Sequence, residues 1–285
     1  MGITKAICFV LVLFFTGSIT ANNSKFSALK GNPGLRSASA IVLDSGGNLI
    51  YGKDIDTVRP IASITKLMTA MVILDAGLDL EEDIVIADQD RDFIRMTGSR
   101  LSVGATLQRR ELLLLALMSS ENRAAAALGR TYPGGLERFV VAMNRKAASL
   151  GMYNSQFADP AGLNADNVST ASDLARMLAA AQRYPMITES TTTLHRDVQP
   201  YVSRGPLTFN NTNRLLKNEN WNIELSKTGY INEAGRCLVM NTNIEGEAVS
   251  IVLLNSFGKL TPYGDSNRLR KWMLASSRTS YTQDT

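Results

Sequence analysis

The sequence is poor in the side chains that metal and histidine chemistry needs. His195 is the only histidine among 285 residues, and it lies in a polar stretch. A zinc site normally takes three or four His, Cys or carboxylate ligands, and no cluster with that spacing occurs. A Ser-His-Asp triad would have to use His195, but no G-x-S-x-G motif accompanies it. Walker-type and G-x-G-x-x-G loops are absent too, which argues against a nucleotide site.

Cysteine and long apolar segments are also scarce. The chain has two cysteines, Cys8 and Cys237, and its one long apolar run, AICFVLVLFF, follows Lys5. A positive head, a run of about ten apolar residues and a small-residue exit are typical of a secretory signal peptide, and the run is too short to span a bilayer. We expect a signal peptide over residues 1–21. The mature chain would be exported to the periplasm without a transmembrane segment, and Cys237 alone could form no internal disulfide.

The remaining composition is ordinary for a globular protein. Hydrophobic residues make up 45% of the chain and charged residues 20%, and the formal net charge is +4. The mature chain is long enough to bury a sizeable core. The basic pair Arg109-Arg110 and the basic run at 268–271 are separated and interrupted by apolar residues. We interpret them as solvated helix faces rather than as a nucleic-acid site.

Strand patterns lie at both ends of the chain, and helical patterns lie between them. Strands are expected within 37–54, around a turn at 44–47, and at 223–231, 235–243 and 248–256. Helices are expected at 61–74, 106–118 with Thr106 as N-cap, 121–130, 136–151, 169–184 capped by Ser169 or Thr170, and 265–276. The order predicts one α+β domain at 37–275, whose antiparallel sheet is built from both chain ends and carries a mostly helical subdomain. A polar leader at 22–36 precedes it, and a tail at 276–285 follows.

Serine chemistry driven by lysine remains possible. The pattern S-x-x-K occurs three times, at Ser27, Ser63 and Ser256, so by itself it is a weak signal. Only Ser63 and Lys66 open a helix that looks buried. Residues three apart are neighbours on one helix face, so the amine can approach the hydroxyl. Burial would disfavour the charged lysine and lower its pKa, making it a better base.

Two further triplets strengthen this interpretation. Ser120-Glu121-Asn122 is the only S-x-N in the chain, and it falls between two predicted helices. Lys227-Thr228-Gly229 is the only K-T-G, and it lies on a predicted strand. The three triplets occur in the order known for class A β-lactamases and penicillin-binding proteins.

The chain resembles the low-molecular-mass penicillin-binding proteins, the serine D-Ala-D-Ala peptidases, and among them the endopeptidases. The likeness extends from about residue 37 to 272 and is carried by several segments: RPIASITKLMTAMV, LLLLALMSSENRAAAAL, DPAGL, NTN, WNIELSKTGY and AGRCLVM. It implies the serine β-lactamase/DD-peptidase fold. It also implies hydrolysis of D-alanyl bonds in peptidoglycan stem peptides and cross-links, acylation by β-lactam antibiotics, and no cofactor or metal.

The resemblance also implies roles for individual residues. Ser63 would be the nucleophile, Lys66 its general base, and Ser120 a proton relay towards the leaving amine. Asn122 would hydrogen-bond the substrate peptide, and Lys227 with Thr228 would hold a substrate carboxylate, Lys227 also lowering the pKa of Lys66. Gly229 completes the K-T-G triplet. The backbone N–H groups of Ser63 and Tyr230 would form an oxyanion hole.

Three alternatives stay open. A β-lactamase would need a deacylating carboxylate, but the stretch at 157–167 has no glutamate, only Asp159 and Asp166. A non-catalytic wall-binding relic would keep the pocket but would have no reason to retain every reactive residue. A D-Ala-D-Ala carboxypeptidase differs from an endopeptidase only in the leaving group. The short segment after Trp272, with no second domain or amphipathic anchor, favours the endopeptidase.

Overall fold

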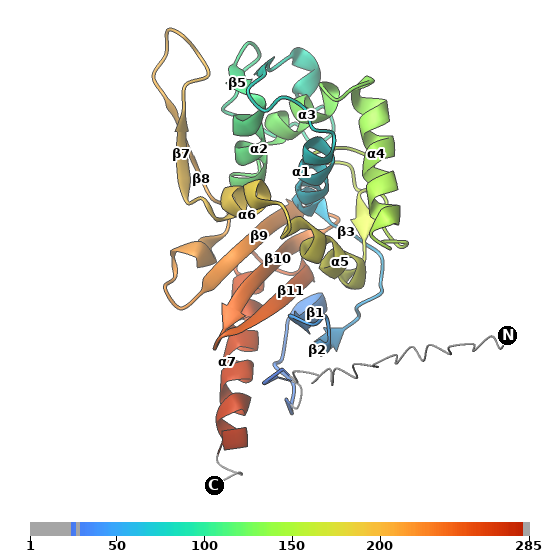
Figure 1. Ribbon diagram of the computed structural model, residues 1–285, viewed down its shortest axis with the longest axis vertical. Coiled ribbons are helices and arrows are strands. Elements are labelled where there is room, and N and C mark those ends of the chain that lie inside the picture. The colour runs from blue at the N-terminus through green and yellow to red at the C-terminus, as the bar shows by residue number, and fades with distance from the viewer. Residues whose placement is uncertain (1–23, 27–28, 282–285) are drawn as a thin grey trace, which may run out of the picture.

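The computed structural model describes residues 24–26 and 29–281, the last six of them by their backbone only. An antiparallel sheet forms its centre, with most helices grouped on one face and one long helix on the other (Figure 1). The predicted α+β class is therefore confirmed. The predicted signal peptide lies outside the described residues. In the described part of the chain, no helix is long and apolar enough to cross a membrane.

The central sheet joins the two ends of the domain. Its strand order is β2-β1-β11-β10-β9, with every neighbouring pair antiparallel. The strands are β1 (Ser37–Asp44), β2 (Leu49–Lys53), β9 (Asn222–Ile231), β10 (Gly235–Ile244) and β11 (Glu247–Ser256). Glu245 and Gly246, both with positive φ, make the two-residue turn between β10 and β11. Strand β9, which carries the K-T-G triplet, is an edge strand, so one of its edges is left for other groups.

Helix α1 (Thr65–Asp75) is the centre of the helical subdomain. All its residues from Thr65 to Ile73 are buried, as expected for a helix that is apolar nearly all round. The helices around it and on the sheet are α2 (Arg109–Met118), α3 (Asn122–Arg130), α4 (Gly135–Ser149), α5 (Ala171–Ala181) and α6 (Pro185–Thr192). Thr170 caps α5 by accepting the N–H of Asp173, one of the two caps expected.

Several local expectations were wrong. Thr106 does not cap a helix: it begins β5 (Thr106–Gln108), which pairs with β4 (Asp83–Val85), and α2 begins three residues later. Pro185 opens the unforeseen helix α6, because proline fits the first turn where its missing N–H is not needed. The predicted last helix runs on as α7 (Thr261–Tyr281) into the predicted tail.

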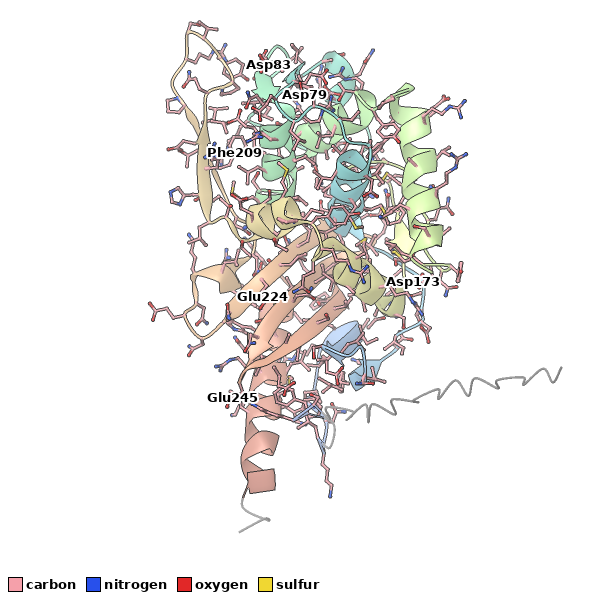
Figure 2. All side chains as sticks on the ribbon, viewed as in Figure 1. Asp79, Asp83, Asp173, Phe209, Glu224 and Glu245 are labelled. Carbon is pink, nitrogen blue, oxygen red and sulfur yellow. The ribbon has the colours of Figure 1, made fainter. Side chains whose placement is uncertain are left out.

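Short elements were not foreseen either. They are β3 (Arg59–Pro60), β6 (Val168–Ser169), β7 (His195–Val198), β8 (Leu207–Asn210) and the 3-10 turns η1 (Ala62–Ile64), η2 (Asp88–Asp90) and η3 (Arg214–Lys217). The β7–β8 hairpin projects beside the helical subdomain and carries Phe209 (Figure 2), whose ring lies 5.2 Å from the guanidinium of Arg100.

The second face of the sheet is covered by α7 and by part of the polar leader. Phe26 and Leu35 of the leader are buried in this second core, with Leu269 and Met273 of α7. The fully buried Asp265 fixes the junction. Its carboxylate accepts the backbone N–H of Arg36 and of Ser37, the Ser37 hydroxyl and the guanidinium of Arg268, at 2.6–3.1 Å. The leader is thus bound to the domain at the start of β1.

We predict that Asp265→Ala lowers the free energy of unfolding by about 3 kcal/mol, because it leaves the buried donors at the start of β1 and the partly exposed guanidinium of Arg268 without their partner. Urea unfolding followed by circular dichroism measures this. The control is Asp88→Ala, which breaks an exposed ion pair with Arg91 and should change stability by less than about 0.5 kcal/mol. Equal effects of the two substitutions would show that the hydrogen bonds of the buried Asp265 carboxylate do not stabilise the fold more than an exposed ion pair does.

Candidate active site

Ser63 and Lys66 lie where strand β3 gives way to helix α1. Ser63 is in the 3-10 turn η1 rather than in α1 itself, and Lys66 is in the first turn of α1. Ala62, just before Ser63, has a φ of +49°, a left-handed conformation that a non-glycine residue adopts only under constraint. The partly buried Ser63 hydroxyl lies 2.9 Å from the Lys66 amine, so the predicted proximity is present.

The Lys66 amine has three hydrogen-bond partners. Besides Ser63 Oγ, it lies 2.6 Å from the carbonyl oxygen of Ala161 and 2.8 Å from Oδ1 of Asn122. A neutral amine has two N–H donors and one lone pair. Because the carbonyl and amide oxygens can only accept, they take the two N–H groups. The lone pair is then left facing the Ser63 hydroxyl, the arrangement in which Lys66 can remove its proton.

Burial sets the basicity of Lys66. The side chain is fully buried, and desolvation lowers the pKa of its amine to about 8 from the usual 10.5. The carboxylates of Asp159, Glu121 and Asp92 act in the opposite direction, because nearby negative charge favours the ammonium. The result is an amine whose neutral form is populated close to neutral pH while it remains a competent base.

Lys227 of β9 is the second buried amine, and its charge and that of Lys66 repel each other. Burial first, and the charge of Lys66 second, hold the pKa of Lys227 well below its usual range. Because two neighbouring cations disfavour each other's protonation, the expected lowering of the Lys66 pKa by Lys227 stays a prediction.

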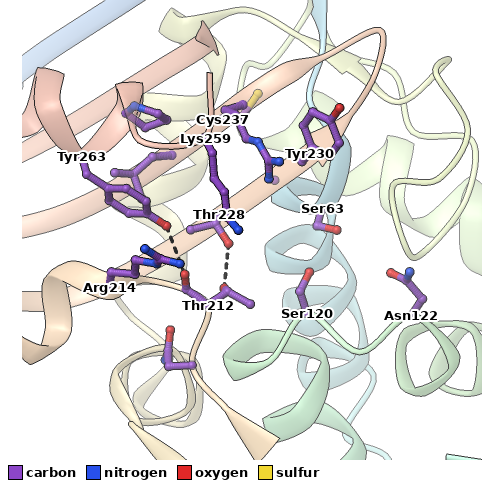
Figure 3. Close-up of a pocket in the computed structure, with 15 residues that line it drawn as sticks. Ser63, Ser120, Asn122, Thr212, Arg214, Thr228, Tyr230, Cys237, Lys259 and Tyr263 are labelled. Carbon is purple, nitrogen blue, oxygen red and sulfur yellow. Dashed lines mark hydrogen bonds between the residues drawn. The ribbon is translucent and has the colours of Figure 1, made fainter. Parts of the chain in front are cut away.

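The S-x-N triplet forms the turn between α2 and α3, as expected. Ser120 has a φ of +59°, and its hydroxyl faces that of Ser63 across the cleft (Figure 3). Glu121 caps α3 by accepting the N–H of Arg123, and its carboxylate also accepts the hydroxyl of Ser99 at 2.7 Å. The strained turn brings Ser120 and Asn122 to the same side of the cleft as Lys66.

A polar chain behind Asn122 escaped the sequence reasoning. Nδ2 of Asn122 donates to Oγ1 of Thr97 at 3.0 Å, and the Thr97 hydroxyl donates to Asp92 at 2.6 Å. Asp92 also accepts the backbone N–H groups of three loop residues, Ile94, Arg95 and Thr97. With Oδ1 facing Lys66 and Nδ2 facing Thr97, the Asn122 amide has one orientation. Only the fold brings this loop to the site, so sequence spacing gave no signal for it.

Gly229 allows strand β9 to lie directly against the turn that carries Ser63. A Cβ at this position would come within 2.9 Å of the carbonyl oxygen of Ile61 and 3.2 Å of the Ser63 nitrogen. A side chain here would force the strand away from Ser63. On the same strand, Thr228 donates its hydroxyl to Thr212 at 2.6 Å, and Tyr230 is half exposed at the rim.

The loop at 157–167 holds no free carboxylate near Ser63. Asp159 is occupied by the backbone N–H groups of Ala161, Gly162, Leu163 and Asn164 and by the amide of Asn167, at 2.6–3.3 Å. It therefore fixes the loop whose Ala161 carbonyl accepts from Lys66. The other acidic residue there, Asp166, is exposed.

These residues border one cavity of about 480 Å³. Ser63, Ser120, Asn122, Thr228, Gly229 and Tyr230 line it, while the buried Lys66 and Lys227 lie behind its wall. Figure 3 also shows residues that sequence reasoning missed, Thr212, Arg214, Lys259 and Tyr263, on the side away from Asn122. Within residues 24–26 and 29–281, no three His, Cys, Asp or Glu side chains are grouped to hold a metal ion.

A serine beside a buried amine, facing a second serine, an amide and a K-T-G strand, defines an active-site serine acyltransferase. Comparison with known proteins gives the family. A family model described as D-alanyl-D-alanine carboxypeptidase matches residues 27–258, so the chain belongs to this family of serine DD-peptidases.

Several relatives are similar over most of this chain. A D-alanyl-D-alanine endopeptidase of Pseudomonas aeruginosa is 50% identical over 84% of this chain and 77% of its own length. One from Escherichia coli is 47% identical over 85% of this chain and 78% of its own length. Among solved structures, the Streptomyces K15 DD-transpeptidase has a TM-score of 0.79 and 27% identity, over 86% of this chain and all of its own. The predicted family and fold are thereby confirmed.

We predict that Thr97→Val slows acylation by a fluorescent penicillin about tenfold, the cost of one hydrogen bond that orients a reactive group. Valine has the shape of threonine but cannot link Asn122 to Asp92. Thr97→Ser keeps the hydroxyl and should retain most of the wild-type rate. A serine variant as slow as the valine variant would show that the methyl group, and not the hydrogen bond, matters.

We also predict the pH dependence of acylation. Because Lys66 must be neutral to accept a proton, the rate should rise with pH and reach half its maximum near pH 8. Glu121→Gln removes a charge that raises the pKa of Lys66 but can still accept from Ser99, so the midpoint should move to lower pH. Glu137→Gln, on the exposed face of α4, should leave it in place. Acylation rates from pH 5 to 10 provide the measurement. An unmoved midpoint in Glu121→Gln would contradict the idea that the titration of Lys66 sets the pH dependence.

Proposed function

We propose that the protein is an exported, periplasmic D-alanyl-D-alanine endopeptidase that cleaves peptidoglycan cross-links through an acyl-enzyme on Ser63. The contact that carries this proposal is the 2.9 Å approach of the Lys66 amine to the Ser63 hydroxyl in a pocket that also presents Ser120, Asn122 and Thr228. The preference for cross-links is supported by the 50% and 47% identical relatives, both named D-alanyl-D-alanine endopeptidase.

The reaction begins when Ser63 Oγ attacks the carbonyl carbon of a D-alanyl residue and its proton passes to Lys66. The backbone N–H groups of Ser63 and Tyr230 would stabilise the oxyanion. One such donor typically contributes about 10²–10³ in rate. The C–N bond then breaks, and the proton held by Lys66 passes by way of Ser120 to the leaving amine. In the second half of the cycle water attacks the ester and gives a proton to Lys66, which returns it to Ser63 Oγ as the ester C–O bond breaks.

Groups on either side of Ser63 would bind the substrate: the amide of Asn122 on one side, and Thr228 with Lys227 on the other. The amide of Asn122 keeps one lone pair and one N–H free after its bonds to Lys66 and Thr97, so it can both accept from and donate to the substrate's peptide group. The hydroxyl of Thr228, with Lys227 behind it, would bind the carboxylate next to the bond that breaks. A β-lactam presents the same carbonyl and carboxylate, so it should acylate Ser63 as well.

A carboxypeptidase is the second candidate, because the matching family model and several relatives carry that name. The two activities share every step at Ser63 and differ in the amine that leaves. A β-lactamase fits less well, since the carboxylate nearest the site in the 157–167 loop, that of Asp159, is occupied by backbone donors.

We predict that the purified protein converts cross-linked muropeptide dimers to monomers, as detected by mass spectrometry, and that Ser63→Ala abolishes both this conversion and labelling by fluorescent penicillin. The variant should remain folded, because the substitution removes one partly exposed hydroxyl. Release of free D-alanine without cleavage of dimers would favour the carboxypeptidase. Many turnovers of nitrocefin per enzyme would indicate a β-lactamase, and a wild-type chain that takes no label would indicate a relic.

A further inference from the structure

The active-site cavity continues beyond Thr228 into a region of positive charge. Arg214, Arg236 and Lys259 line it, and no aspartate or glutamate does. Figure 3 shows Arg214 and Lys259 extending toward the part of the cleft bordered by Thr228 and Tyr263. The guanidinium groups of Arg214 and Arg236 both lie close enough to the Tyr263 phenol to oppose the rise in the phenol's pKa that burial causes. Arg214 and Arg236 therefore border the same part of the cavity, next to Tyr263.

None of these three cations has an anionic partner in the described part of the chain. Other arginines of this protein are paired, such as Arg95 with Glu233 and Arg130 with Asp90, each at 2.8 Å. Arg214 and Lys259 are exposed, and the guanidinium carbon of Arg236 lies over the ring of Tyr230, 3.7 Å from its centre. Stacking of this kind holds a guanidinium in place and leaves its N–H edge free for a ligand.

A second hollow adjoins the first on this side. Its volume is about 370 Å³, and Tyr230, Arg236 and Lys259 line it as well as the active-site cavity. Its other walls are polar or small, apart from Phe257, whose side chain is 92% exposed. The two hollows together leave room for a chain that passes Thr228 and continues between the cations.

Charge and position together indicate what such a chain would be. If Thr228 binds the carboxylate beside the bond that breaks, the cations lie on the side of the leaving group. Free D-alanine carries one carboxylate, which Thr228 would already bind. The leaving strand of a cross-link is a peptide with additional carboxylates. A guanidinium binds a carboxylate through two parallel N–H donors and is suited to hold one of these.

We propose that Arg214 and Arg236 form a second carboxylate site, which binds the leaving peptide strand of a cross-link and favours it over a single D-alanine. The inference rests on the proposed function and specifies the substrate on the leaving side. A single arginine on the surface, solvated by water, would not indicate a binding site. Here two of them border the cavity of the nucleophile, lack counter-ions among the described residues, and share one neighbour, Tyr263.

The first test compares two substrates with the same donor peptide, one ending in D-Ala-D-Ala and one cross-linked to a second peptide. Arg214→Gln and Arg236→Gln should each lower kcat/KM for the cross-linked substrate about tenfold, the scale of one lost charge-assisted contact, and change that for the D-Ala-D-Ala substrate less than about twofold. Arg214→Lys keeps the charge and should recover part of the loss. Lys217→Gln, an exposed cation of the same turn η3 outside the cavity lining, is the control.

The second test does not require cleavage. The free leaving peptide should slow labelling of the wild-type protein by fluorescent penicillin, and the same peptide with amidated carboxylates should do so far less. In Arg214→Gln the inhibition constant should rise about tenfold, because one charge-assisted contact is lost. An unchanged constant, or equal losses on both substrates, would overturn the second carboxylate site. A wild-type protein that takes label but leaves cross-links intact would instead contradict the endopeptidase function, while the competition still tests the site.

Discussion

The contact between the Lys66 amine and the Ser63 hydroxyl is the interaction on which the rest of the site depends. It works because two oxygens that can only accept, those of Ala161 and Asn122, take the two N–H groups of the neutral amine. In this geometry the lone pair of Lys66 points to the Ser63 hydroxyl, and the neutral amine is the form that can accept its proton. The surrounding core of α1 excludes water, and this desolvation lowers the pKa of the amine. The reactive state is a consequence of burying a lysine whose neutral form is fully hydrogen-bonded.

Three separate parts of the fold must meet within hydrogen-bond distance for this contact to exist. Turn η1 and the start of helix α1 supply the serine and the lysine, the α2–α3 junction supplies the amide, and the loop held by Asp159 supplies the carbonyl. Strand β9 closes the site from the other side, and Gly229 permits an approach that any side chain would block. Each part is fixed by its own bonds rather than by the site: Asp92 orders one loop, Asp159 another, and Glu121 caps α3. The side chains proposed to be catalytic are therefore positioned without a substrate.

The sequence was sufficient for features that depend on local pattern. Alternating and continuous apolar residues located the strands of both chain ends and the buried α1, and the three triplets located Ser63, Lys66, Ser120, Asn122 and Lys227. What it missed depends on contacts between distant segments. Thr97 and Asp92 reach Asn122 only through the folded loop, and the carbonyl of Ala161 has no sequence signature at all. Thr106 was misassigned because threonine suits both a helix cap and a strand, and pairing with β4 decided the outcome.

Charge is distributed unequally across the cleft, and the two sides have different consequences. The carboxylates of Asp92, Glu121 and Asp159 lie close enough to Lys66 to raise its pKa, so they keep a fully buried amine from becoming too weak a base. The cations Arg214, Arg236 and Lys259 lie at the other end, and none of them is among the described charges that shift the pKa of Lys66. A positive field near the general base would lower its basicity, whereas the same field farther along the cleft can attract an anionic peptide without that cost. With the two ends separated, one set of charges tunes the pKa of Lys66, and the other is free for the proposed binding of the leaving strand.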